Sequence, residues 1–246
     1  MQPYQGTSIK RAMILAAGLG TRFKPWTDHH PKALAVINGK SLLQRNIEYL
    51  RQYGIYEVVV NVHHFADQIQ QALHDHKGWG SEIKISDERE EVLETGGGLK
   101  KAAALLYNQT FVLMNVDILT DLDLRNMMNF HLRLLPLATL AVSNRNSSRK
   151  FLFDHFHNLC GWRNTQTGAE KISRTAADII PKAFSGIHII EPGLLSLLSR
   201  EGKFSMVDVY LDLAFSEIIK GYDHTGSKFI DVGKPEAVAL ASELFP

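Results

Sequence analysis

The stretch from Met13 to Leu34 reads MILAAGLGTRFKPWTDHHPKAL, and the rest of the chain is interpreted from it. Its first three residues are apolar, as in a short buried strand. Small residues follow at once, and Gly18 and Gly20 allow a tight turn whose amide N–H groups carry no side-chain cover. Arg22 then adds a positive charge. Uncovered amides beside a cation are suited to binding phosphate oxygens.

Two common glycine motifs do not fit this stretch, and a Gly-x-Gly pair alone is more often only a tight turn. The dinucleotide fingerprint requires a third glycine where this chain has Phe23, which disfavours a nicotinamide site. Gly39-Lys40-Ser41 looks like the end of a P-loop, but Leu34 stands where its leading glycine belongs.

The whole string is more specific than either glycine. It resembles the signature of the sugar-1-phosphate nucleotidyltransferases, also called NDP-sugar pyrophosphorylases, at the positions Gly18, Gly20, Thr21, Arg22, Pro25, Thr27, Pro31 and Lys32. The family usually has Pro-Lys-Pro where this chain has Ala33 after the lysine. The resemblance extends from Ala12 to Leu244 and is weakest between Ser143 and Ile180.

Composition limits the classes of protein that remain. With 246 residues, 45% of them hydrophobic, the chain can bury a full core, and we expect one domain over residues 1–246, with residues 1–10 loosely ordered. Its 27 basic and 26 acidic residues give no basic excess for nucleic acid. The single cysteine, Cys160, and the lack of a leader or long apolar span favour a cytoplasmic protein that contacts no membrane.

Strand and helix patterns alternate after the opening stretch, which predicts an α/β fold with a doubly wound, mostly parallel, Rossmann-like sheet. In such sheets ligands bind beyond the carboxyl ends of the strands. The predicted helices are 41–53, 66–74, 99–106, 124–134, 194–198 and 204–219, and the predicted strands are 13–15, 57–62, 83–86, 111–117, 137–142, 184–190 and 228–231. Short strands between 151 and 175 predict a small sugar-side β insertion.

The segment Leu93–Gly98, LETGGG, comes directly before the predicted helix 99–106. Without the resemblance it would be a turn capped by Thr95. It is similar to the corresponding string of N-acetylmuramic acid-1-phosphate uridylyltransferases and to that of heptose and mannose guanylyltransferases. The resemblance implies contacts with the base and ribose from Glu94, Thr95, Gly96 and Gly97. An acid can accept N–H bonds from uracil or guanine, so Glu94 does not decide between them.

The predicted apolar strand 111–117 ends in Asn115, Val116 and Asp117. Asp117 could merely cap a turn, but a carboxylate at this edge also suits Mg²⁺, which prefers oxygen ligands and substrate phosphates. The family has glycine in place of Val116, so we expect a conformation here that favours glycine. The resemblance implies that Asp231, in the string FIDVGK, is the second metal carboxylate and that Asn115 contacts the nucleotide.

The acceptor half of the chain matches fewer of the family's strings. The segment 184–190, FSGIHII, resembles a family strand whose glycine, here Gly186, lets the sugar lie against the backbone; a bulge glycine is the alternative. Many relatives carry Glu-Lys-Pro before this strand, and its lysine meets the sugar phosphate. This chain has only Glu170-Lys171-Ile172, which leaves four candidate cations: Lys150, Arg163, Lys171 and Lys182.

The resemblance implies that a sugar 1-phosphate attacks the α-phosphorus of a nucleoside triphosphate and expels pyrophosphate, with Mg²⁺ as cofactor. The backbone at Ala16, Ala17, Gly18, Gly20 and Thr21 would hold the nucleotide, with Arg22 and Lys32 as catalytic cations. UTP with an amino-sugar or muramic-type acceptor, as in cell-wall synthesis, is favoured over GTP with mannose or heptose 1-phosphate. An amino-alcohol phosphate acceptor and a non-catalytic nucleotide-sugar-binding regulator remain as alternatives, as do a monomer and a homodimer.

Overall fold

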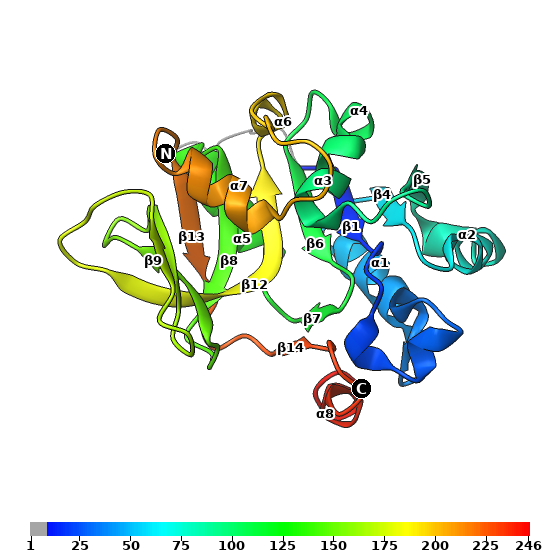
Figure 1. Ribbon diagram of the computed structural model, residues 1–246. Coiled ribbons are helices and arrows are strands. Elements are labelled where there is room, and N and C mark those ends of the chain that lie inside the picture. Colours follow the sequence, from blue (N-terminus) through cyan, green and yellow to red (C-terminus); the bar gives the residue numbers. More distant parts are fainter. Residues whose placement is uncertain (1–8) are drawn as a thin grey trace.

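The computed structural model describes residues 9–246 (Figure 1). The expectation of a loosely ordered start therefore falls, for residues 1–8, outside the described residues, whereas Ile9 is buried in the core. No helix in the range 9–246 has the length and apolar character needed to span a membrane.

A ten-stranded sheet runs through the molecule, and its first half is parallel. Strand β1 (Arg11–Leu15) lies between β4 (Glu57–Val62) and β6 (Phe111–Asn115), and β5 (Glu82–Asp87) forms one edge. Strands β1, β4 and β6 are short, largely apolar and buried, as inner parallel strands are, whereas the edge strand β5 is mostly exposed or half-buried. Their carboxyl ends meet at one edge of the sheet. The predicted α/β fold with a mostly parallel sheet is confirmed.

Beyond β6 the sheet becomes mixed because β12 (Ile180–Ile190) pairs antiparallel with β6. Strand β12 also pairs with β8 (Ala138–Ser143), which is parallel to β13 (Ile219–Asp223). At its other end it joins an antiparallel ribbon of β9 (Arg149–Phe153), β10 (Leu159–Asn164) and β11 (Glu170–Ile172). Figure 1 shows this ribbon at the end of the sheet opposite to β5, where the sequence predicts a β insertion.

Helices cover both faces of the sheet. Alternate residues of β1 point to opposite faces, so Ile14 belongs to one apolar cluster and Met13 to another. The helices that pack with Ile14 are α1 (Leu42–Gln52), α2 (Ala66–Asp75), α5 (Leu124–Leu134) and α8 (Ala237–Leu244). Those that pack with Met13 are α3 (Glu94–Lys101), α4 (Ala103–Leu106), α6 (Gly193–Ser196) and α7 (Met206–Leu213).

Two of the predicted helices differ from the observed ones. The helix expected over 99–106 begins five residues earlier, at Glu94, and is divided after Lys101 into α3 and α4. Its Thr95 is not a cap, because the Thr95 hydroxyl instead accepts a hydrogen bond of 2.9 Å from the backbone N–H of Met206. The helix expected over 204–219 ends at Leu213 as α7, and residues 219–223 form β13 instead.

A small second sheet brings the C-terminal part of the chain to the carboxyl edge of β6. Strand β14 (Phe229–Asp231) pairs antiparallel with β7 (Ile118–Thr120), and Asp231 stands opposite Ile118. The backbone N–H of Val232 donates to the carbonyl oxygen of Asp117 at 2.8 Å. Figure 1 shows these two strands side by side, apart from the main sheet. Asp117 and Asp231 thus become neighbours.

Candidate active site

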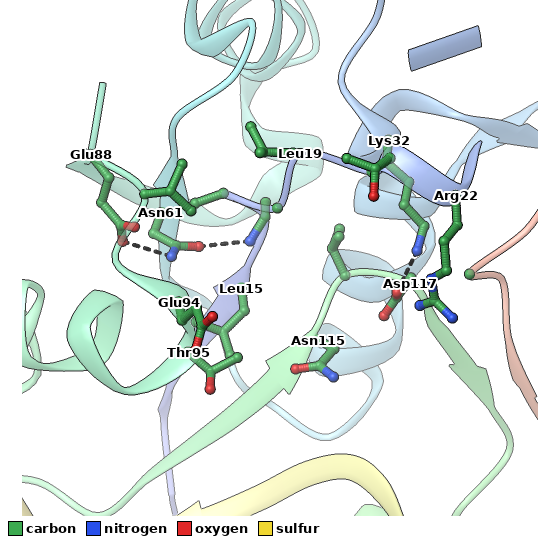
Figure 2. Close-up of a pocket in the computed structure, with 18 of the residues that line it drawn as sticks. Leu15, Leu19, Arg22, Lys32, Asn61, Glu88, Glu94, Thr95, Asn115 and Asp117 are labelled. Carbon is green, nitrogen blue, oxygen red and sulfur yellow. Dashed lines mark hydrogen bonds and ion pairs between the residues drawn. The ribbon is translucent and has the colours of Figure 1, made fainter. Parts of the chain in front are cut away.

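A cleft with a volume of about 480 Å³ lies at the carboxyl ends of β1, β4 and β6 (Figure 2). Its position agrees with the rule for ligand sites in open α/β sheets. Most of the residues predicted to form the site line it, namely Ala16, Ala17, Gly18, Gly20, Thr21, Arg22, Lys32, Glu94, Thr95, Asn115 and Asp117.

The loop after β1 presents backbone amides to the cleft. Among the described residues, none accepts a hydrogen bond from the N–H groups of residues 17–20. Gly20 has a φ of +61°, and a Cβ added there would lie 2.9 Å from Thr27 Cγ2, so a larger residue would be strained. The Thr27 hydroxyl donates to the Gly20 carbonyl at 2.9 Å and fixes the turn. The loop is therefore a fixed cradle of donors suited to phosphate oxygens.

A buried polar chain anchors the start of this loop. Asn61, near the end of β4, accepts a hydrogen bond of 2.6 Å from the N–H of Ala16 through its Oδ1 atom. Its Nδ2 group donates to Oε1 of the buried Glu88 at 2.7 Å. Figure 2 shows both bonds. Neither residue was expected in the site from the sequence, although a lone amide in the apolar strand EVVVNV is a usable signal.

Glu88 is an unusual component of this chain because its second oxygen, Oε2, has no hydrogen-bond partner among residues 9–246. Burial raises the pKa of Glu88, and the bond from Asn61 lowers it only in part. Gly98 in α3 packs directly on the pair, since an added Cβ would lie 2.7 Å from Glu88 Oε1. Glu88 and Asn61 both line the cleft, and Asn61 links the acid to the start of the loop after β1.

The opposite wall of the cleft carries the charged groups. The Lys32 ammonium forms an ion pair with Oδ2 of Asp117, and Arg22 lies beside them in Figure 2. Gly233 closes this wall, because a Cβ added there would lie 2.7 Å from Asp231 Oδ1 and 3.1 Å from Arg22 Nη2. Two cations and two carboxylates from distant parts of the chain therefore meet here.

The pKa of Asp231 is raised by loss of solvation and, in part, by the negative charge of Asp117. The cations Lys32, Arg22 and Arg145 act in the opposite direction. Two adjacent carboxylates that repel each other are a donor set for a hard divalent cation. Within residues 9–246 no group of three His, Cys, Asp or Glu side chains forms a closed metal site. The remaining ligands would have to come from water or substrate phosphates.

Comparison with known proteins agrees with this geometry. The nucleotidyl transferase family matches residues 11–151. The N-acetylmuramate α-1-phosphate uridylyltransferase of Caulobacter vibrioides is 32% identical over 95% of this chain and 96% of its own length. The chain belongs to the nucleotidyl transferase family.

Other proteins similar to this nucleotidyl transferase are named for, or bind, a guanine nucleotide instead of a uracil nucleotide. The D-glycero-α-D-manno-heptose 1-phosphate guanylyltransferase of Campylobacter jejuni is 40% identical over 46% of this chain and 50% of its own length. The crystal structure of HddC from Yersinia pseudotuberculosis complexed with GMP-PN superposes with a TM-score of 0.77 at 25% identity, covering 97% of this chain and 100% of that one. The family resemblance read from the sequence is confirmed.

Val116 does not adopt the conformation expected for it in this nucleotidyl transferase. Val116 does not have a positive φ, and its side chain is buried in the core beside α1. The Val116 carbonyl accepts a bond of 2.7 Å from the buried Asn46 amide. A β-branched residue therefore fits here without backbone strain, and the expectation of a glycine-like conformation was wrong.

Of the predicted site residues, Gly96, Gly97, Gly186 and Asp231 do not line the cleft, although Asp231 lies next to the lining residue Gly233. The N–H groups of Gly96 and Gly97 both donate to the Phe204 carbonyl, at 2.9 and 3.3 Å, so they join α3 to the loop before α7. Gly186 has a φ of +71°, and an added Cβ would lie 2.8 Å from the amide of Asn115, which does line the cleft. Gly186 thus borders the site, whereas Gly96 and Gly97 are packing residues.

None of the four cations considered for the acceptor phosphate lines the cleft. Lys171 pairs with Asp208 at 2.7 Å, and Arg163 forms an ion pair with Glu170. Lys182 is buried and contacts Asp223 at 2.5 Å and Asn144 at 2.7 Å. Lys150 stands opposite Arg163 in the β9–β10 ribbon. Three of the four are thus held in ion pairs outside the cleft.

Proposed function

We propose that this protein joins a nucleoside triphosphate and a sugar 1-phosphate to give a nucleoside diphosphate sugar and pyrophosphate. A phosphate oxygen of the sugar 1-phosphate forms the new bond to the α-phosphorus. The bond from the α-phosphorus to the oxygen that bridges it to the β-phosphorus breaks, and pyrophosphate leaves. The attacking oxygen is already anionic at neutral pH, so the step needs no general base.

The observation that carries this proposal is that four features meet at one cleft: the amide-lined loop after β1, Arg22, Lys32, and the carboxylate pair of Asp117 and Asp231. An amide-lined loop and Arg22 provide donors for the β- and γ-phosphates of the triphosphate. Lys32 lies where it can stabilise charge that develops at the α-phosphate. Phosphoryl transfer depends mostly on such positioning and charge neutralisation, because the protein has little covalent chemistry to perform.

Asp117 and Asp231 would hold the divalent cation, for which we propose Mg²⁺. Both offer carboxylate oxygens, and they approach each other in spite of their repulsion. When bound, the cation supplies Lewis acidity and holds phosphate oxygens in place. The β7–β14 pairing and the bond from Val232 N–H to the Asp117 carbonyl hold the two acids next to each other, where they would bind the cation.

For the base we propose uracil, with an amino-sugar or muramic-type 1-phosphate as acceptor. Support comes from the nearly full-length similarity to a uridylyltransferase and from Glu94 and Thr95 at the edge of the cleft. Guanine with heptose or mannose 1-phosphate is the second candidate, supported by the Campylobacter relative and by the Yersinia structure with a guanine nucleotide. Cys160, buried and free of any disulfide within residues 9–246, supports a reducing compartment such as the cytoplasm.

The test is a panel in which UTP, GTP, CTP, ATP and dTTP are each combined with several sugar 1-phosphates. Pyrophosphate release is measured with and without Mg²⁺. We expect release that depends on the metal and is fastest with UTP. Release that is fastest with GTP would select the guanylyltransferase alternative. Silence across the panel would contradict the enzymatic proposal and favour a nucleotide-sugar-binding regulator.

A further inference from the structure

An arginine that is not one of the four candidate cations lies on the acceptor side of the site. Arg145 follows β8, and its Nη2 group donates to the Phe184 carbonyl of β12 at 2.6 Å. Its guanidinium carbon lies 4.9 Å from the centre of the Phe229 ring in β14. The side chain thus extends from one strand end across to two others.

This placement puts the guanidinium beside the proposed metal carboxylates. Phe229 and Asp231 are two residues apart in β14, so their side chains point to the same face of that strand. A guanidinium stacked on Phe229 is therefore a neighbour of Asp231. Their mutual influence agrees with this, since each charge shifts the pKa of the other group.

The same arginine borders the cleft through β12. Phe184, whose carbonyl it holds, is two residues before Gly186. Gly186 lies against the side chain of Asn115, and Asn115 lines the cleft. Arg145 itself does not line the cleft, but it connects β12 near Gly186 with β14 near Asp231, so it lies between the proposed metal carboxylates and the strand where the sugar would lie.

Arg145 lacks a counter-ion such as those that pair with Arg163, Lys171 and Lys182. Within residues 9–246 its only side-chain hydrogen bond is the one to Phe184, no carboxylate forms an ion pair with it, and its buried Nε has no partner. Burial of an unpaired charge is unfavourable, so the arrangement is stabilised if an anion binds. The planar guanidinium presents parallel N–H donors that match phosphate oxygens in pairs.

We propose that Arg145 binds the phosphate of the acceptor sugar 1-phosphate and holds it for attack. The inference rests on the proposed function, and it deepens that function by assigning the acceptor phosphate to a residue outside the four candidates from the sequence. Arg145 fixes the phosphate from the sugar side, while the cations of the opposite wall act on the triphosphate.

The test compares Arg145→Gln and Arg145→Lys with the wild type. We expect the KM for the sugar 1-phosphate to rise about 10- to 100-fold in Arg145→Gln, as for a lost hydrogen-bonded charge. Arg145→Lys retains the charge without the planar fork and should show a smaller rise. Binding of the nucleoside triphosphate, measured directly by calorimetry without acceptor, should stay within about twofold of the wild type.

Two further variants sharpen this comparison. Arg200→Gln removes an exposed arginine that pairs with Asp212. It should change neither the KM for the sugar 1-phosphate nor the affinity for the nucleoside triphosphate. Lys171→Gln tests the cation of the Glu-Lys-Ile string; if it raises the acceptor KM while Arg145→Gln does not, the assignment is overturned. If Arg145 only stabilises β12 through its bond to Phe184, both Arg145 variants will lower Tm and weaken nucleotide binding in parallel. That result would also overturn the assignment.

The outcomes separate this inference from the function on which it rests. An active wild type whose acceptor KM is unchanged in Arg145→Gln overturns the assignment of Arg145 alone. A wild type that releases no pyrophosphate with any substrate pair overturns the proposed function, and the assignment falls with it.

Discussion

Arg22 and Lys32 come from the stretch after β1, Asp117 and Asp231 come from two distant segments, and each of the four carries a charge that a folded core would not need. All four were predicted from the sequence because they stand in strings that resemble those of the family. Asn61 and Glu88 were not predicted, because Glu88 looks like an ordinary acid of an acidic loop and the lone amide of Asn61 in an apolar strand does not indicate its partner. Only the fold brings them together beneath the loop after β1.

The two carboxylates predict opposite effects on activity and stability. Asp231→Asn and Asp117→Asn should each lower kcat about 100- to 1,000-fold, since either removes a charge that organises the reacting phosphates. The Tm of Asp231→Asn should hold or rise, because the repulsion from Asp117 and the cost of desolvation are relieved. Pyrophosphate release and thermal unfolding measure the two effects.

Asp212→Asn is the matched control for these variants, because Asp212 is an exposed acid that pairs with Arg200 away from the cleft. It should leave kcat near the wild-type value. Activity that survives in Asp117→Asn, or a Tm that collapses along with activity, would contradict the assignment of these acids to the reaction.

Glu88 predicts a specific pH dependence of stability. Its pKa is raised above the ordinary value of 4.5, so the folded protein keeps this proton to a higher pH than the unfolded chain does. Its contribution to the free energy of unfolding is complete below about pH 4.5 and is lost as the pH rises through the folded-state pKa. We therefore expect wild-type stability to fall in that window relative to Glu88→Gln, which keeps an oxygen for Asn61.

Denaturant unfolding at a series of pH values from acid to neutral measures this difference. Glu90→Gln changes an exposed acid of the same loop and should run parallel to the wild type. A Glu88→Gln curve that also stays parallel would show that Glu88 titrates alike in both states.

At the level of helices and strands, the local sequence pattern predicted most elements. It gave the wrong bounds where contacts between distant segments determine the structure. Helix α5 has the predicted bounds, with Asp123 as its cap, because its start signal and apolar spacing agree. The glycine string before Leu99 looked like a loop, since glycine is the weakest helix former after proline. It is helical because α3 approaches the backbone of the loop before α7 so closely that only glycine fits. That contact is non-local and leaves no signal in sequence.

This close contact predicts that Gly97→Ala is destabilising. In an open helix the change would stabilise by about 1 kcal/mol. Here the added Cβ would lie 2.3 Å from the Gly202 carbonyl oxygen, which is backbone and cannot rotate away. Overpacking of this kind costs about 1–3 kcal/mol, so the clash outweighs the helix preference.

Gly193→Ala is the control, because an added Cβ in α6 has its nearest neighbour at 4.0 Å. It should hold or raise Tm, whereas Gly97→Ala should lower it. Equal shifts for the two variants would mean that helix propensity rather than packing governs α3. Chemical denaturation gives both values.

Over the whole molecule, β12 connects the two halves of the chain. It comes late in the sequence but lies between β6 on one side and β8 and β9 on the other. The sequence predicted the strand itself, but not its antiparallel place in the middle of the sheet, because strand order depends on contacts between distant segments. The single domain expected from length remains a prediction.

That arrangement predicts one cooperative unfolding transition for the full chain. A fragment of residues 9–151 would leave β6 as an open apolar edge without β12, and it should aggregate or show no cooperative transition. Calorimetry and circular dichroism of both proteins test this. Two separate transitions in the full chain, or a fragment that unfolds cooperatively, would mean that the halves are independent domains.

The ion pair between Lys32 and Asp117 has a consequence for the order in which substrates arrive. A bare divalent ion would have to displace an ammonium group from the carboxylate and leave that group without a partner. An ion that arrives already chelated by a triphosphate brings the lysine a new anionic partner at the same moment. We therefore expect an ordered mechanism in which the metal–nucleotide complex is the leading substrate and the sugar phosphate follows.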